Sequence, residues 1–435
     1  MKKKYLLPVC FIAFLMILTL SFYVIKNIDP NFINYILGIS TFESEDGTID
    51  NNFISENNII LNSGKSNSSC VIISGYKTLS DTNEKRLYLA IKSGAEKITD
   101  EKYKNFEYYQ LAPITISGTS LSASQIKKVV YAFQFDNPEI FWISNLFNYS
   151  NNQNKTVIHL TSIFSKSEKE KAVKKFNEKI SEITSKTSRL PNEYEKELFI
   201  HDYLIENCSY KKSTSPNNYK IYTAYGCLVE KEAVCEGYSK AMQILLCNLG
   251  IKCQTITGSR EKEDHMWNVA KIDNNWYHVD VTWDCVGELQ KYDYFNLSDE
   301  LIKKSHSINS IATETSDFSQ DKKYNFDLPK CTSMGKNYLE INSVKIESLN
   351  DETRKEIIKK LISLASENKK MIHLMIKNNY NNYKTKLLNE EPLIYFECLK
   401  AANSNLLSSH KLSTKQSQFL ENKNQNVITL RLIYE

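Results

Sequence analysis

The segment AVCEGY, residues 233–238, decides the fold of this chain, because it places a cysteine where a helix begins. Downstream, apolar residues recur at the i, i+3, i+4 and i+7 spacing of a buried helix face, and Gly250 is a natural C-cap. Cys235 is therefore expected among the free N–H groups at the positive end of the helix. The free N–H groups and the positive end of the helix dipole both favour the thiolate, which is the nucleophilic form of cysteine. The same N–H groups can stabilise an oxyanion. Gly237 is expected to let a substrate backbone approach closely.

Two further segments, HMWN at 265–268 and WYHVDVTWD at 276–284, predict a β-hairpin around turn residues 273–275. Side chains alternate along a strand, so the register decides whether His265 and Asp280 share a face. A two-residue turn pairs Trp267 with Asp280 and places His265 diagonal to Asp280 on that face. A register shifted by one residue would place His265 and Asp280 on opposite faces of the hairpin. We predict the first register, or a bulge with the same result.

Cys235, His265 and Asp280 are the predicted catalytic residues. A histidine can deprotonate the thiol, and a carboxylate can fix the tautomer of the histidine. This arrangement suits acyl transfer through a thioester, with water or an amine as acceptor. Any single Cys, His or Asp is more often a core or surface residue. His278 and Asp284 are rival candidates, and His278 is also a candidate structural partner of Asp280. The remaining histidines and tryptophans of the region are interpreted as structural residues or pocket wall: His201, His306, Trp267, Trp276 and Trp283.

Taken together, the three segments closely resemble the bacterial transglutaminase-like superfamily, whose pattern is C-x-G-Y-A, then H-A-W-N, then W-Y-x-V-D-x-T-W. The resemblance covers about residues 191–300. It implies an α+β, papain-like core, in which the helix bearing the cysteine packs on an antiparallel sheet, and a Cys–His–Asp triad at Cys235, His265 and Asp280. Ser239 and Met266 depart mildly from the pattern. The superfamily includes crosslinking enzymes, peptidases and deglycosylating amidases.

The flanks of this core are also familiar. DNPEIFW at 136–142 is similar to a segment of secreted transglutaminase-like proteins of Gram-positive anaerobes, and YFNLS at 294–298 with His306 resembles the end of the same domain. This similarity implies a cell-surface location.

The N-terminus favours the same location. Three lysines precede the uncharged residues 5–25, a length that spans a bilayer, so we expect a single-pass membrane anchor with the rest of the chain outside the cell. A cleaved signal segment, giving a secreted protein, is the alternative. Residues 26–70 are polar and are interpreted as a stalk. An α/β domain is expected at 71–190, the transglutaminase-like domain at 191–325, and a C-terminal α/β domain at 326–435.

Local patterns predict the elements of these regions. A capping box at 122–125 opens a helix that ends before Pro138. Helices are expected at 167–184, from Pro191 in the first turn to Asn207, and at 351–365. Strands are expected at 156–160, and half-buried strands at 372–376 and 428–432.

Composition excludes several functions. The net charge is +4 without a dense basic block beyond the start, so no nucleic-acid partner is expected. The ten cysteines include no CxxC pair, so no metal is expected, and no organic cofactor is implied. Disulfide pairing stays open.

The sequence thus predicts a thiol enzyme acting on peptides or proteins, with cell-wall peptide among the candidates. Hydrolysis is favoured slightly over Gln–Lys crosslinking. The alternative from another class is a surface scaffold or adhesion module with an idle triad.

Overall fold

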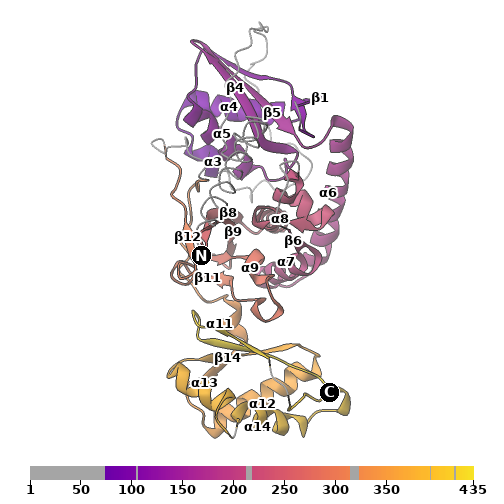
Figure 1. Ribbon diagram of the computed structural model, residues 1–435, viewed down its shortest axis with the longest axis vertical. Helices are drawn as coiled ribbons and strands as arrows, with labels where there is room; N and C mark the ends of the chain where they lie inside the picture. The colour runs from indigo at the N-terminus through magenta and orange to yellow at the C-terminus, as the bar shows by residue number, and fades with distance from the viewer. Residues whose placement is uncertain (1–73, 104–105, 212–217, 314–322, 392, 416–417) are drawn as a thin grey trace, which may run out of the picture.

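The computed structural model describes residues 74–103, 106–211, 218–313, 323–391, 393–415 and 418–435. The chain is α+β, and three sheets follow one another along its long axis, each with its own helices (Figure 1). The sheets are antiparallel apart from one strand pair in the C-terminal sheet and a two-residue pair beside the central one.

The N-terminal part packs helices against a five-stranded sheet of order β1-β2-β5-β3, with β4 also paired to β5. The predicted capping box is confirmed, because Ser122 and Gln125 exchange hydrogen bonds at the start of α5. The strand expected at 156–160 is β5, and the long helix expected at 167–184 is α6. The elements are α3 (Ser74–Thr78), α4 (Thr82–Gly94), β1 (Ile98–Lys102), β2 (Tyr109–Leu111), β3 (Ile114–Ser117), α5 (Ala123–Asp136), β4 (Ile143–Asn152), β5 (Lys155–Ser162) and α6 (Lys166–Thr187).

The central part confirms the predicted helix on an antiparallel sheet. Helix α8 packs on a sheet of order β11-β10-β9-β8-β12. The main elements are α7 (Glu193–Asn207), α8 (Cys235–Asn248), β8 (Cys253–Arg260), β9 (Glu263–Ile272), β10 (Asn275–Val279), β11 (Phe295–Leu297) and β12 (His306–Ile308). Shorter elements connect them: β6 (Ser209–Tyr210), η1 (Tyr219–Tyr222), η2 (Gly226–Glu230), β7 (Glu232–Ala233), α9 (Val281–Asp284), η3 (Glu288–Gln290) and α10 (Asp299–Ile302).

The prediction that Pro191 lies in the first turn of α7 is wrong. The N-cap is Asn192, whose side chain accepts from the Glu195 N–H, so Pro191 precedes the helix. An asparagine side chain that binds a free first-turn N–H is a stronger start signal than proline.

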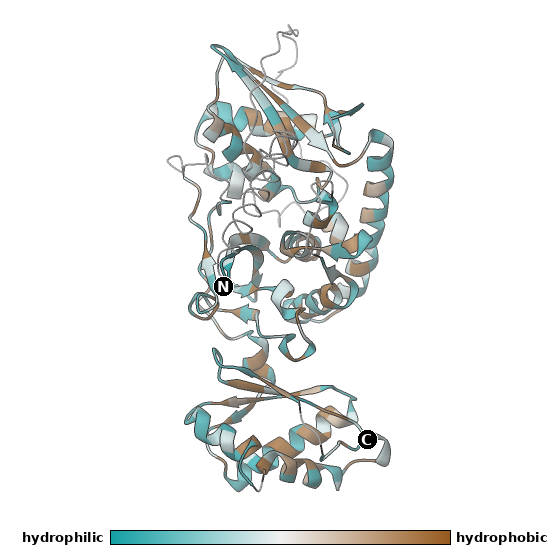
Figure 2. Ribbon diagram, in the orientation of Figure 1, coloured by the Kyte–Doolittle hydropathy of each residue, from teal (hydrophilic) through white to brown (hydrophobic). Residues whose placement is uncertain are grey.

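The C-terminal part has a four-stranded sheet of order β13-β14-β16-β15, with β13 parallel to β14. Hydrophobic residues alternate with hydrophilic ones along its helices (Figure 2). The elements are α11 (Tyr338–Asn342), β13 (Val344–Ile346), α12 (Asp351–Ser366), β14 (Met371–Ile376), α13 (Tyr380–Leu388), α14 (Ile394–Asn403), η4 (Ser408–His410), β15 (Phe419–Asn422) and β16 (Val427–Arg431).

The expectation that β14 is half-buried is wrong, because residues 372–376 are all buried. Ile372, Leu374 and Ile376 belong to the core of the C-terminal part. Met375, on the opposite face, belongs to the larger core. Both faces of β14 are therefore covered by other parts of the protein. The alternation of residue types in the sequence does not reveal this.

One continuous hydrophobic cluster joins the N-terminal and central parts, with members from Leu79 on the N-terminal side to Phe326 and beyond. The helix that bears Cys235 contributes to this cluster through Tyr238, Ala241 and Met242. The start of α8 is thus held by packing from both parts. The domain boundaries at 190 and 325 stay predictions.

Two expectations concern residues outside the described ranges. The anchor at 5–25 and the stalk at 26–70 lie there, and so do Cys10 and Cys70. Within the described ranges, no helix combines the length and apolar character needed to cross a bilayer. All eight cysteines in those ranges are free thiols.

Candidate active site

The hairpin of β9 and β10 has the predicted register. Asn275 pairs with Ile272 and Val279 with Asn268, and the same register continued by one residue sets Trp267 against Asp280. The two turn residues, Asp273 and Asn274, have positive φ of 46° and 71°. Such a two-residue turn fits the twist of a hairpin. His265 and Asp280 therefore lie on one face, as predicted.

The structure brings the three predicted site residues together. His265 Nε2 lies 2.7 Å from Asp280 Oδ2, and the Cys235 side chain lies close enough to His265 to raise its pKa. Because Nε2 is taken by Asp280, the ring nitrogen that faces the thiol is Nδ1. Asp280 is fully buried and His265 nearly so, whereas Cys235 is partly exposed. The sulfur is therefore the member of the line that a substrate can reach.

The electrostatics of this line keep a proton on His265. Burial alone lowers the pKa of His265, but the charge of Asp280 and the hydrogen bonds to Asp280 and Cys235 raise it to about 10. Burial raises the pKa of Asp280, but the charge of His265 and the hydrogen bonds from His265 and His306 outweigh it and lower that pKa. At neutral pH the pair is thus an imidazolium beside a carboxylate.

Backbone N–H groups at the N-terminus of α8 are available as hydrogen-bond donors. Val234, at the N-cap, makes no side-chain capping bond, so the N–H groups of the first turn are not used by a cap. The Val234 N–H itself donates to the Ile221 carbonyl at 3.0 Å, which fixes the entry of the chain into the helix. The first-turn N–H groups can therefore donate to an oxyanion formed beside Cys235.

The role expected for Gly237 is wrong. A Cβ at this position would lie 2.5 Å from the Ile221 carbonyl oxygen and 2.8 Å from the Ala233 Cβ. Gly237 is needed because this chain's own backbone in η1 approaches the helix, and not because a substrate does. The spacing of the motif is the same in either case, so the sequence could not distinguish them.

Two side chains join the helix of Cys235 to the strand of His265. Ser239 Oγ lies 2.8 Å from the Cys235 carbonyl oxygen and 2.9 Å from that of Met266. Asn268 Nδ2 donates to the Ser239 carbonyl at 2.9 Å. These contacts are buried and set the distance between α8 and β9, and hence between thiol and imidazole.

His306 is a site residue that sequence reasoning missed. Its Nε2 lies 2.9 Å from Asp280 Oδ2, the oxygen that also contacts His265, and its Nδ1 lies 2.8 Å from Ser305 Oγ. Strand β12 carries His306 to the edge of the sheet by pairing with β8. The likeness of residues 294–298 with His306 to the end of the domain was the one available signal. A three-residue strand in a polar stretch gave no periodicity to place it.

The rival candidates have other partners. His278 Nδ1 accepts from Trp267 Nε1 at 3.1 Å, and its Nε2 lies 2.8 Å from Asp299 Oδ1, so it is not a partner of Asp280. Asp284 Oδ2 lies 3.1 Å from His201 Nε2. The His201–Asp284 bond is buried and the His278–Asp299 bond is partly buried, and neither pair includes a triad residue.

The tryptophans divide between core and wall as interpreted. Trp267 is fully buried, and Trp276 packs partly buried against the cluster around it. Trp283 stands edge-on to His265, with ring centroids 6.5 Å apart, and the Arg260 guanidinium lies 3.4 Å above its ring.

Hydrogen bonds explain the two groups of side chains in the described residues that have the spacing of metal ligands. In the first, His265, Asp280 and His306, the carboxylate already contacts both imidazoles. In the second, His278, Asp299 and Cys331, His278 Nδ1 accepts a hydrogen bond from the Trp267 Nε1–H. The Nε2 atom of a neutral His278 therefore carries the hydrogen and donates to Asp299, which makes it a poor metal ligand.

Comparison with known proteins agrees with this description. Residues 180–281 match the transglutaminase-like superfamily, so the central part has a transglutaminase-like core. No curated protein matches the chain.

Three solved structures have limited similarity to the chain. A TGase is 13% identical, with a TM-score of 0.26, and the match covers 49% of this chain and 61% of the other. A candidate cysteine protease from Cytophaga hutchinsonii is 16% identical, with a TM-score of 0.20, over 43% and 69% of the two chains. A candidate protease from Parabacteroides distasonis is 12% identical, with a TM-score of 0.20, over 31% and 35%. The chain thus spans less than two thirds of the first and third of these proteins.

Proposed function

We propose that this chain is a cysteine acyl-transfer enzyme that acts on amide bonds of peptides or proteins. Cys235 is the nucleophile, His265 the acid–base group and Asp280 the carboxylate that orients it. The observation that carries the proposal is that the buried Asp280 contacts His265, and that the partly exposed Cys235 lies beside His265 and raises its pKa. The match of residues 180–281 to the transglutaminase-like superfamily supports the same chemistry.

The residues of the site account for each proton. With the Cys235 proton on His265, the thiolate attacks the amide carbon and a C–S bond forms, while the first-turn N–H groups of α8 bind the oxyanion. The tetrahedral species collapses, the C–N bond breaks, and His265 gives its proton to the leaving amine. His265 then takes a proton from the acceptor as it attacks the thioester, and returns it to the sulfur. Asp280 stays ionised and holds Nε2, so Nδ1 stays directed at the thiol.

The acceptor decides the reaction. Water gives hydrolysis, and a lysine amine gives a crosslink between Gln and Lys side chains. We place hydrolysis first, with surface peptides or cell-wall peptides as substrates.

An acceptor experiment tests the proposal. The purified full-length chain is incubated with a glutamine-bearing protein and a labelled primary amine, beside Cys235→Ala. Peptide release without incorporation supports hydrolysis, and incorporation supports crosslinking, provided that Cys235→Ala abolishes either one. If neither product depends on Cys235 over a broad peptide panel, the surface scaffold with an idle triad is the better account.

We also propose a cell-surface location, on a single anchor at residues 5–25. The support is the uncharged run that follows three lysines. Alkaline extraction of membranes tests it: an anchored chain stays in the pellet, a cleaved one is released. Protease added to intact cells should then degrade the folded part, and protection from that protease would contradict the orientation.

A further inference from the structure

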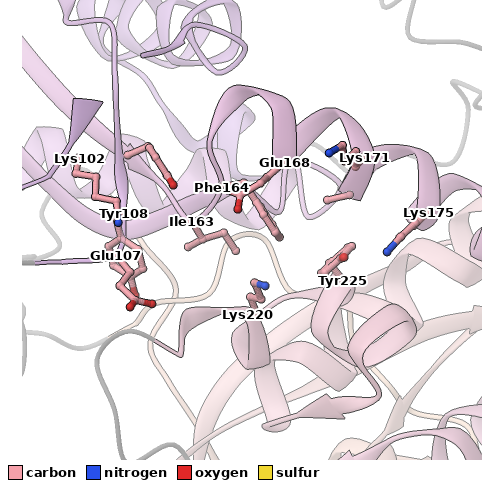
Figure 3. A pocket seen from close by; sticks show the side chains of 12 residues that line it. Lys102, Glu107, Tyr108, Ile163, Phe164, Glu168, Lys171, Lys175, Lys220 and Tyr225 are labelled. Carbon is pink, nitrogen blue, oxygen red and sulfur yellow. The ribbon is translucent and has the colours of Figure 1, made fainter. Parts of the chain in front are cut away.

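A second concave site lies away from the triad. A cavity of about 470 Å³ opens between β1, the start of α6 and η1 (Figure 3). Its volume is in the range of small-molecule sites. None of its lining residues is Cys235, His265 or Asp280.

The cavity is lined by four lysines from three separate elements. Lys171 and Lys175 extend from α6, Lys220 lies opposite them on η1, and Lys102 comes from the end of β1 (Figure 3). Within the described ranges, Lys102, Lys171 and Lys175 make no ion pair, and the closest carboxylate oxygen to Lys220 is that of Glu230, at 3.9 Å. Four ammonium groups therefore face one space with little compensation.

Two carboxylates share the lining, and one of them is already engaged. Glu168 Oε2 accepts from the Ser165 N–H at 2.9 Å and lies 2.8 Å from Ser165 Oγ, as the partner in the capping box of α6. These bonds, and then the charges of Lys220 and Lys102, lower the pKa of Glu168. The second carboxylate of the lining is that of Glu107, which is exposed. The lining therefore keeps an excess of positive charge.

Buried aromatic side chains form part of the cavity wall. Phe164 and Tyr225 are buried, with ring centroids 5.4 Å apart, and Lys220 Nζ lies 4.9 Å from the Phe164 centroid. Tyr108 is also buried. The cavity thus combines a buried aromatic wall with lysine side chains at its rim, of which Lys102, Lys171 and Lys175 are exposed.

We propose that this cavity is a binding site for a multiply charged oxyanion, whose phosphate or carboxylate groups span from α6 to η1. Ammonium groups are compact point charges that suit such groups, and several of them around one concave space favour a ligand with several charges. The site goes beyond the proposed function, because its lining does not include the triad.

Calorimetric titration of the full-length chain with tripolyphosphate, and separately with citrate, tests the proposal. We expect saturable binding at one site that weakens as salt is added. Lys175→Glu should weaken binding by roughly tenfold or more, because it reverses one of the charges that line the cavity. Lys174→Glu is the matched control, since it makes the same charge change at an exposed neighbour on α6 that does not line the cavity. Its effect should stay under about twofold because of screening.

Each result of these titrations supports or overturns the proposal. Binding of tripolyphosphate alone identifies a phosphate-bearing ligand, binding of citrate alone a carboxylate-bearing one, and binding of both supports the shared chemistry. If neither saturates, or if Lys174→Glu and Lys175→Glu weaken binding equally, the proposal is overturned. Lys171→Glu replaces Lys175→Glu should the latter unfold. Cys235→Ala must bind as tightly as the wild type, and loss of binding in that variant would place the anion in the triad cleft instead.

Discussion

Asp280→Ala should destabilise the central part severely. Asp280 Oδ1 accepts from the Thr282 and Trp283 N–H groups at 3.1 and 3.2 Å, and it is the N-cap of α9. Loss of such a cap costs about 1 kcal/mol. Asp280 Oδ2 contacts His265 and His306 at 2.7 and 2.9 Å. Removal of one partner from a buried ion pair costs about 3–5 kcal/mol. We therefore expect a loss of about 4–6 kcal/mol, a large share of the roughly 5–15 kcal/mol that stabilises a domain.

Urea unfolding followed by tryptophan fluorescence measures this loss, because three of the four tryptophans, at 267, 276 and 283, report on the central part. Asp280→Asn is the comparison. It keeps the shape and the capping oxygen but loses the charge, so it should be intermediate between the wild type and Asp280→Ala. A loss below about 1 kcal/mol for Asp280→Ala would refute the view that this carboxylate holds the site together.

Three further predictions concern single groups. The folded pKa of His265, about 10, lies above its ordinary 6.5, so its contribution to stability is complete below pH 6.5 and is lost as pH rises through 10. The gap in unfolding free energy between wild type and His265→Gln should shrink over that window, and a constant gap would contradict the ion pair. Gly237→Ala should lower the free energy of unfolding by about 1–3 kcal/mol or prevent folding, because the new Cβ would lie too close to the Ile221 carbonyl oxygen. Gly250→Ala is the comparison: its Cβ would meet open space, but its φ of 80° should cost about 1 kcal/mol. Equal losses in the two variants would argue against the close approach at Gly237. Burial raises the pKa of Glu197 from 4.5 to about 8, so the free energy of unfolding should decrease as pH rises from 4.5 to 8. In unfolding measurements over this pH range, Glu197→Gln should flatten that slope. An unchanged slope would show that another group titrates.

The hairpin and the helix of Cys235 were predictable because their signals are local. The turn at 273–274 sets the register without knowledge of the rest of the fold, and the register decides that His265 and Asp280 share a face. The α8 helix follows from its apolar spacing in the same way. Such features need only neighbouring residues.

The second partner of Asp280 was not predictable in this way. His306 reaches the carboxylate because β12 pairs with β8, a contact across some fifty residues of chain whose energy lies in the backbone ladder and not in a sequence pattern. The full burial of β14 and the close approach at Gly237 also depend on which element packs on the other side. Tertiary partners decided each of these cases.

The pKa of His265 also depends on tertiary surroundings that the sequence does not reveal. An unperturbed histidine titrates near pH 6.5. The structure buries His265 beside an ionised Asp280, and the pKa rises to about 10. The sequence identified the pair, but the shift depends on how far water is excluded from it.

The rate of thiol alkylation at Cys235 is the most direct test of the account. Peptide mapping after a short pulse of iodoacetamide at pH 7 compares Cys235 with Cys247 and Cys285, the other two partly exposed cysteines of the described ranges. We predict that Cys235 reacts fastest and that His265→Ala slows it at least tenfold while leaving the other two unchanged. Equal rates at the three cysteines, or a Cys235 rate that is indifferent to His265→Ala, would contradict the claim that these two side chains act together.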